Sequence, residues 1–231
     1  MKYWCLSVAS LVLSFAGLPA ASDVVELPMA ARSHVPTGWK VVEQATGDLN
    51  GDGLPDLVFV REEQDPKKMT KHPSIEGYIL NTNTRVLVVL LADKVGYRKV
   101  GETAKFVMPA FVAEFDNFGD CYAGLKVNKG LVEVAFSWEA SIGSWWGSQV
   151  RCKFRIETSR LRLIGSEEVS LNRATGEKSI TSNNYLTGRR KLTTGLNEFD
   201  PKVSHAEDEW KTFDAKKPIY LEDLPPGGET R

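Results

Sequence analysis

Apolar side chains alternate with polar ones along most of this chain, and a two-residue period is the pattern of strands whose two faces meet different surroundings. The clearest example is 132–138, where two valines, a phenylalanine and a tryptophan share one face. Residues 150–157 repeat the pattern, with charged side chains on the other face. The turn residues 128–130, Asn-Lys-Gly, precede the first run and predict a hairpin. Strands with one apolar and one polar face indicate an antiparallel sheet.

Further strands and turns extend this pattern. Residues 57–60 and 85–91 are almost wholly apolar, which is typical of central strands that are covered on both faces. Turn residues at 93–96 and 172–176 predict two more hairpins. A length of 231 residues suits one domain, or at most two small ones. We therefore predict a mainly β protein of one domain, an antiparallel meander sheet that is sandwich-like or partly closed, with few short helices.

The remaining segments set the boundaries of the predicted domain, 23–213. A short helix is one interpretation of 203–213, because Ser204 suits its N-cap and Glu207 follows three residues later. Residues 65–74 are polar, and we interpret them as a surface loop. Residues 214–231 contain Lys-Lys-Pro and Pro-Pro-Gly-Gly, which predict an extended or flexible tail.

The overall charge is balanced. Lys and Arg total 29, Asp and Glu total 30, and the formal net charge is -1. Such a balance argues against broad electrostatic binding to nucleic acid or to acidic lipids, so we expect no nucleic-acid partner.

Residues 1–22 have the three parts of a secretory signal peptide. Lys2 supplies the positive charge, 8–16 form a short apolar stretch, and the small residues at 20–22 suit a signal peptidase. The apolar stretch is shorter than the roughly 20 residues that span a bilayer. The alternative is a retained membrane anchor. We predict a periplasmic or secreted protein that has no transmembrane segment once the signal is removed.

Export also bears on the cysteines. Cys5 lies within the predicted signal, which leaves Cys121 and Cys152 as a pair in an oxidising compartment. A disulfide between them would close a loop of about 30 residues and stabilise the fold by about 3–4 kcal/mol in the chain-entropy picture. The alternative is two buried thiols. We predict the disulfide as a structural bridge.

Oxygen-bearing side chains are concentrated in 48–56, of sequence Asp-Leu-Asn-Gly-Asp-Gly-Leu-Pro-Asp. They stand at loop positions 1, 3, 5 and 9, namely Asp48, Asn50, Asp52 and Asp56. Gly53 at position 6 allows a sharp bend, and the carbonyl of Leu54 is available at position 7. Because Ca²⁺ takes about six to eight oxygen ligands, this spacing predicts a structural calcium site.

The loop differs from an EF-hand, since Phe59 stands where a bidentate Glu is required and a strand follows instead of a helix. It resembles the calcium loops of FG-GAP and VCBS-type repeats over residues 47–61. That resemblance implies side-chain ligands from the four Asp and Asn residues and a backbone ligand from Leu54. A propeller would repeat the loop at a regular period, and the chain does not, so the likeness concerns the metal loop alone. The alternative is an Asx-rich turn that binds no metal.

Two weaker features concern the surface. Trp145 and Trp146 stand in a Gly/Ser-rich loop, where they would contact a partner or a sugar, or else cover one end of the core. The basic run 189–191 would contact an anion or lie on a solvated hairpin tip or strand edge, and we favour the second interpretation.

No familiar catalytic motif is present: the sequence has no HExxH, no GxSxG and no phosphate-binding glycine loop. We therefore expect no catalytic residues to be identifiable, and a binding role more than an enzyme. The predicted function is an exported, calcium-stabilised binding or interaction module, of inhibitory or immunity type, with an unknown protein partner in the cell envelope. The alternative is a carbohydrate-binding or hydrolase-accessory protein whose partner is a glycan.

Overall fold

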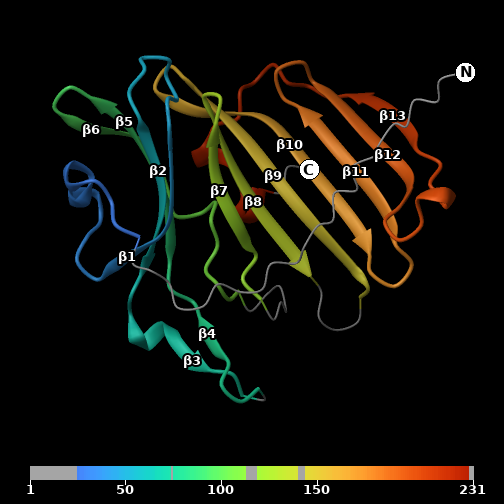
Figure 1. Cartoon of the computed structure of the whole chain (residues 1–231), viewed down its shortest axis with the longest axis horizontal. Helices are drawn as coiled ribbons and strands as arrows, with labels where there is room; N and C mark the ends of the chain where they lie inside the picture. The colour runs from blue at the N-terminus through green and yellow to red at the C-terminus, as the bar shows by residue number, and fades with distance from the viewer. Residues whose placement is uncertain (1–24, 74, 113–118, 140–143, 229–231) are drawn as a thin grey trace, which may run out of the picture.

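The computed structural model describes residues 25–73, 75–112, 119–139 and 144–228 (Figure 1). Most of these residues are in strands, and the helices among them are short 3-10 turns. The strands are β1 (Trp39–Gly47), β2 (Asp56–Glu63), β3 (Met69–Lys71), β4 (Ile79–Asn81), β5 (Arg85–Asp93), β6 (Gly96–Thr103), β7 (Tyr122–Asn128), β8 (Leu131–Glu139), β9 (Trp146–Glu157), β10 (Arg160–Asn172), β11 (Glu177–Asn184), β12 (Arg189–Asn197) and β13 (Glu207–Thr212). The 3-10 helices are η1 (Met29–His34), η2 (Pro66–Lys68), η4 (Pro201–Val203), η5 (Leu221–Asp223) and η6 (Pro226–Gly228).

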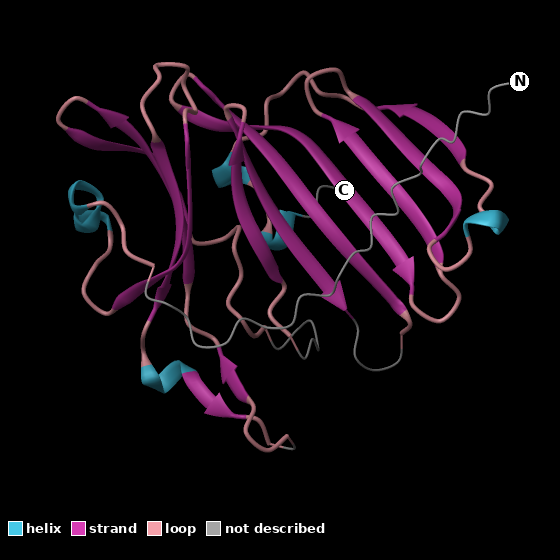
Figure 2. Ribbon diagram, in the orientation of Figure 1, coloured by secondary structure: helices cyan, strands magenta, loops and turns pink. Residues whose placement is uncertain are grey.

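The strands form two main antiparallel sheets. The four-stranded sheet has the order β1-β2-β5-β6, and the seven-stranded sheet is a meander in the order β13-β12-β11-β10-β9-β8-β7. Strands β3 and β4 form a separate small hairpin below the four-stranded sheet as drawn in Figure 2. The prediction of a mainly β, antiparallel, sandwich-like single domain with few short helices is therefore confirmed.

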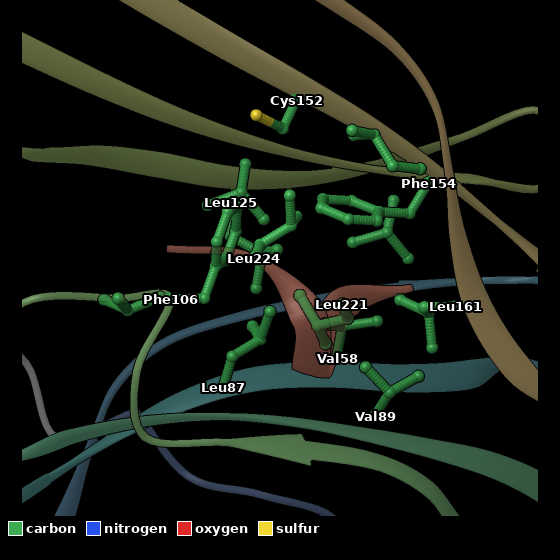
Figure 3. Close-up of a cluster of buried hydrophobic side chains, with 14 of the residues drawn as sticks. Val58, Leu87, Val89, Phe106, Leu125, Cys152, Phe154, Leu161, Leu221 and Leu224 are labelled. Carbon is green, nitrogen blue, oxygen red and sulfur yellow. The ribbon is translucent and has the colours of Figure 1, made fainter. Parts of the chain in front are cut away.

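The core lies between the two sheets (Figure 3). Val58, Leu87 and Val89 of the four-stranded sheet are fully buried against side chains such as Phe154 and Leu161 of the seven-stranded sheet. The alternate residues of β2 and β5 form a second apolar cluster on the other face of the four-stranded sheet, which η1 helps to cover. Both faces of β2 and β5 are thus buried, which explains why their sequences are almost wholly apolar.

The two sheets meet where β1 lies beside β7. Glu43 connects them, because its carboxylate accepts a hydrogen bond from the Tyr122 hydroxyl at 2.6 Å and another from the Leu125 backbone N–H at 3.1 Å. Each strand has a β-bulge close to this contact, between Val41 and Glu43 in β1 and between Tyr122 and Gly124 in β7. A bulge redirects a side chain and ends regular pairing, so it lets Glu43 reach the edge of the other sheet.

The predicted hairpin turns are confirmed. β7 and β8 are joined through Lys129 and Gly130, whose φ angles of 50° and 75° suit the tight turn of a two-residue hairpin. Asp93 closes the β5–β6 turn by accepting from the N–H of Val95 and of Gly96. Asn172 accepts from the loop N–H groups between β10 and β11 in the same way.

The structure corrects the helix interpretation of 203–213. η4 ends at Val203, and β13 pairs with β12 in an antiparallel ladder. The cap signal at Ser204 was misleading, because its hydroxyl bonds Asn197 and so ties the segment to the end of β12. The polar insertion 65–74 is also more ordered than a plain surface loop, since it contains η2 and β3; residue 74 lies outside the described residues.

Residues 214–228, which we predicted as an extended or flexible tail, contain no strand but are packed against the rest of the domain. Leu221 and Leu224 lie in the core, as Figure 3 shows, and the Ile219 carbonyl accepts from the N–H of Leu163 in β10. The proline and glycine residues end regular structure, but the two leucines bring the segment into the space that β6, β9 and β10 leave open. Residues 229–231 and the predicted signal, 1–22, lie outside the described residues.

The predicted Cys121–Cys152 disulfide is absent, and both cysteines are buried. Cys121 precedes β7 and pairs through its carbonyl with Ser137 of β8, whereas Cys152 lies opposite Val134 on the far side of β8. One strand therefore separates them. Two strand spacings are about 9.6 Å, whereas the Cα atoms of a disulfide lie within about 6.8 Å. Burial raises the pKa of the Cys152 thiol to about 12, which keeps it protonated.

The Glu43 contact predicts a stability defect. Glu43→Ala leaves the Tyr122 hydroxyl and the Leu125 N–H without this acceptor, so we expect the free energy of unfolding to fall by about 2 kcal/mol in urea denaturation. Glu133→Ala is the control, because Glu133 on β8 makes only a long, partly exposed ion pair with Lys153 and its loss should change the value by less than about 0.5 kcal/mol. Equal losses in the two variants would contradict a special role for Glu43.

Candidate metal centre and exposed aromatic side chains

The candidate metal loop joins β1 to β2, which are neighbours in the four-stranded sheet. Gly51 and Gly53 both have positive φ angles, +82° and +81°, in the left-handed region that a side chain disfavours. These two positions bend the chain so that the side chains of the loop turn back on its own backbone. The glycine that the sequence placed at the bend therefore has the expected role.

Asp48 organises the loop. Its Oδ1 accepts from the backbone N–H groups of Asn50, Gly51 and Asp52 at 2.6–3.2 Å, and its Oδ2 accepts from Gly53 at 2.9 Å. The hydrogen bond from Gly53 is the main cause that lowers the pKa of the exposed Asp48 carboxyl below its usual value. The loop therefore holds a carboxylate in its charged form at its centre.

Asn50 and Asp52 lie next to each other on this loop. The Asn50 side-chain amide donates to Oδ2 of Asp52 at 2.8 Å, and the Asp52 N–H donates to Oδ1 of Asn50 at 3.0 Å. Oδ1 of Asp52 accepts from the N–H of Leu54 at 2.8 Å. Three of the predicted side-chain ligands are thus brought together at the exposed end of the loop.

Asp56 differs from the others because it is fully buried. Its Oδ2 accepts from the Leu49 N–H at 2.7 Å, and its Oδ1 accepts from the Ala92 N–H at 2.8 Å near the end of β5. A buried carboxylate needs such partners, and these two join the start of the loop to a neighbouring strand. Asp56 therefore has a structural role that does not require a metal.

The loop also approaches the second sheet. A Cβ at Gly47 would lie 2.5 Å from Cγ1 of Val127, and one at Gly130 would lie 3.7 Å from the Asp48 carbonyl oxygen. The start of the loop is therefore packed against the β7–β8 turn, while Leu49 is buried in the core between the sheets. An ion in this loop would stabilise a part of the chain where both sheets meet.

The donor set suits a hard cation in composition, since it consists of carboxylate and amide oxygens. In the described conformation the backbone amides of the loop satisfy Asp48, and no three His, Cys, Asp or Glu side chains in the described part of the chain are gathered as a metal-binding group. A carboxylate has about four lone-pair positions, and Asp52 and Asp56 each use two of them here. The carboxylates of Asp52 and Asp56 therefore each keep lone pairs with which they could coordinate an ion.

Trp145 and Trp146 are exposed, with 66% and 43% of their surface accessible. The Trp145 carbonyl accepts from the N–H of Arg173 in the β10–β11 turn, so the two tryptophans stand beside that turn. Phe199, which is 61% exposed, packs against Gly176 at the other end of the same turn. The three aromatic residues flank one end of the seven-stranded sheet. Phe199 could not be predicted from the sequence, because no local signal indicates that it lies at the same turn as Trp145 and Trp146.

A buried ion-pair network was also missed. Arg85 of β5 is 6% exposed and donates to Glu62 at 2.8 Å and to Asp120 at 2.7 Å. Burial opposes the charge on Glu62, but the Arg85 guanidinium outweighs it and the pKa of this carboxyl is lowered. Each charge is paired with another, as buried charges require, so we take the network as structural.

No family model matches the chain, and no curated protein or solved structure matches it either. Within the described residues no helix is long and apolar enough to span a membrane.

The geometry of Asp56 predicts that this residue stabilises the fold with or without a metal. Asp56→Asn would set an amide NH₂ against one of two backbone N–H donors, and we expect the free energy of unfolding to fall by about 2–3 kcal/mol even in a chelator. Asp93→Asn is the control, because both of its bonds go to one oxygen that Asn keeps. Denaturation curves for the two variants, measured with a chelator present, test this difference; a neutral Asp56→Asn would refute it.

Proposed function

We propose that this protein is an exported binding module whose β1–β2 loop is stabilised by a structural calcium ion. The observation that carries the proposal is the loop itself, where Asp48, Asn50 and Asp52 converge through a tight turn and Asp56 anchors the base. Alternating oxygen side chains in a turn with two positive-φ glycines form the arrangement that Ca²⁺ sites use.

The ion would be held by oxygens from the side chains of Asp48, Asn50, Asp52 and Asp56 and from the carbonyl of Leu54. Its positive charge would reduce repulsion among three carboxylates in one short loop. The loop would also be held without the ion, because Asp56 bonds the end of β5 and Leu49 is buried in the core. The alternative is a turn in which the backbone amides satisfy Asp48 and no ion binds.

The proposal predicts a calcium-dependent melting temperature. Calcium at 100 times its dissociation constant should add about 2.7 kcal/mol, which for a protein of this size is a rise of about 5–10 °C over the value in chelator. Asp52→Asn should abolish the rise, because it removes a charged ligand on an exposed loop and leaves an oxygen for Leu54. Thermal unfolding in calcium and in chelator measures both.

Asp200→Asn is the matched control, since Asp200 caps η4 outside the loop and its substitution should leave the calcium response intact. Magnesium should give a smaller rise than calcium, because it demands a tighter octahedral arrangement. Identical melting of the wild type in calcium and in chelator would show that the loop is only a turn.

The binding role is supported by the exposed aromatic side chains beside the β10–β11 turn. Trp145 and Trp146 do not cover the core, and exposed tryptophans are common at the centres of binding surfaces. Export is supported by the signal-like residues 1–22. We therefore propose a protein partner of the periplasm or of the extracellular space, bound at least in part through these two side chains.

A second candidate is carbohydrate binding, favoured by the same exposure, because exposed tryptophan rings offer flat apolar surfaces for sugars to stack on. The two candidates differ in the kind of ligand that the protein should bind. A protein partner would be captured from an envelope extract in stoichiometric amount, whereas a glycan ligand would hold the protein on purified cell-wall polysaccharide.

Replacement of both tryptophans by alanine should weaken the relevant binding about tenfold or more and change the free energy of unfolding by less than about 1 kcal/mol. Capture from envelope extract and retention on cell-wall polysaccharide, each in calcium and in chelator, measure the binding. Val95→Ala, on the β5–β6 turn and 95% exposed, is the control for loss of an exposed apolar side chain. A double variant that keeps both kinds of binding would remove the tryptophans from the proposed surface.

A further inference from the structure

The outer edge of the seven-stranded sheet is formed by β13, and all six of its residues are exposed (Figure 1). Its sequence is Glu-Asp-Glu-Trp-Lys-Thr, and the Trp210 side chain is 55% exposed. An edge strand presents backbone N–H and C=O groups to which another strand can pair.

The other edge strands of the two main sheets have neighbours. β7 and β1 cover each other, with Glu43 bonding the Leu125 N–H, and β6 is covered by η1, η5 and β10. Among the edge strands of the two main sheets, β13 is therefore the one at which a further strand would meet the least obstruction from other described elements.

The pairing of β13 with β12 determines which residues of β13 direct their backbone N–H and C=O groups toward β12 and which direct them outward. The Phe213 N–H donates to the Gly188 carbonyl, and the ladder continues in step from Arg189–Thr212 to Thr194–Glu207. Because hydrogen-bonded and non-hydrogen-bonded pairs alternate, the odd-numbered residues of β13 bond to β12. The backbone groups of Asp208, Trp210 and Thr212 therefore point outward.

This alternation limits the registers in which β13 of a second copy could pair with β13. In an antiparallel pair about a two-fold axis, outward-facing residues must lie opposite outward-facing residues, so the axis has to pass through a residue and not between two. An axis at Asp208, Glu209 or Lys211 sets like charges opposite each other. An axis at Trp210 sets Glu209 opposite Lys211 twice, with no like-charged pair.

We propose that β13 is a homodimer interface, in which two copies pair antiparallel about Trp210 and join their seven-stranded sheets into one. The two Trp210 side chains then lie on the same face as a cross-strand aromatic pair, which stabilises a sheet, while the opposite charges of Glu209 and Lys211 fix the register. The occupant is a second copy because the charge pattern of the strand is complementary to itself.

The neighbouring strand prepares this surface. The Arg189 guanidinium lies 4.4 Å from the centroid of the Trp210 ring, and Lys191 is salt-bridged to Asp208 at 2.9 Å on the same face. These contacts hold the indole and the acidic side chain in place before a partner arrives, which reduces the ordering cost of association. The inference does not depend on calcium or on the tryptophans at 145 and 146.

A cysteine cross-link tests the register. In the proposed dimer the two Trp210 Cα atoms face each other at about 5.5 Å, within the range of a disulfide, so Trp210→Cys should form a covalent dimer under mild oxidation of the purified full chain. Thr212→Cys is the matched control, because Thr212 lies opposite Asp208 of the other copy and about 13–14 Å from its own equivalent. The wild type, oxidised in parallel, accounts for the native cysteines.

A charge swap tests the recognition. Sedimentation velocity should show a wild-type dimer, and Lys211→Glu should raise its dissociation constant about tenfold or more by setting acidic side chains opposite each other. The double variant Glu209→Lys with Lys211→Glu reverses both charges and should restore the wild-type constant. Circular dichroism of each variant shows that the fold is kept.

Three results would overturn the proposal. One is a wild type that stays monomeric at every concentration tested, in which case the charges of β13 keep the edge unpaired. Another is a dimer that survives Lys211→Glu unchanged, since its interface would then lie elsewhere. The third is equal cross-linking through positions 210 and 212, which would show random collision.

Discussion

The apolar face of the seven-stranded sheet is covered by the four-stranded sheet over only part of its width, the part formed by β7 to β10. The buried core draws most of its side chains from those strands and from β2 and β5, while β13 at the far edge is fully exposed. The two sheets are held in that position on one side by Glu43 between β1 and β7, and on the other by the segment that carries Leu221 and Leu224.

The β1–β2 loop lies on the side of the molecule where β1 of one sheet meets β7 of the other. Asp56 bonds the end of β5, Leu49 enters the core, and Gly47 approaches Val127 of β7. An ion in the loop would therefore act on the junction of the two sheets and not on a loop in isolation. Trp145 and Trp146 lie at one end of the seven-stranded sheet, beside the β10–β11 turn, and β13 forms the far edge of that sheet. The surfaces proposed to bind partners are therefore separate from the loop proposed to bind calcium.

The strand pattern, the hairpin turns and the fold class could be predicted from the sequence, because a two-residue period and turn residues are local signals. The remaining features depend on contacts between distant segments. The segment after Ser204 forms a strand and not a helix, because it pairs with β12. Leu221 is buried because its segment fills the space that β6, β9 and β10 leave open. The expected disulfide needed Cys121 and Cys152 on adjacent strands, and β8 lies between them. For the loop, the sequence identified the oxygen residues but could not show that Asp56 is committed to two backbone amides.

Hydrogen–deuterium exchange of the backbone amides, with and without calcium, tests the central claim most directly. If calcium holds the loop at the junction of the sheets, it should slow exchange in 47–56 and also in the β7–β8 turn that packs against Gly47, with little change in β11 to β13. Exchange that is the same in calcium and in chelator throughout 47–56 would contradict the account and leave the loop as a turn closed by its own amides.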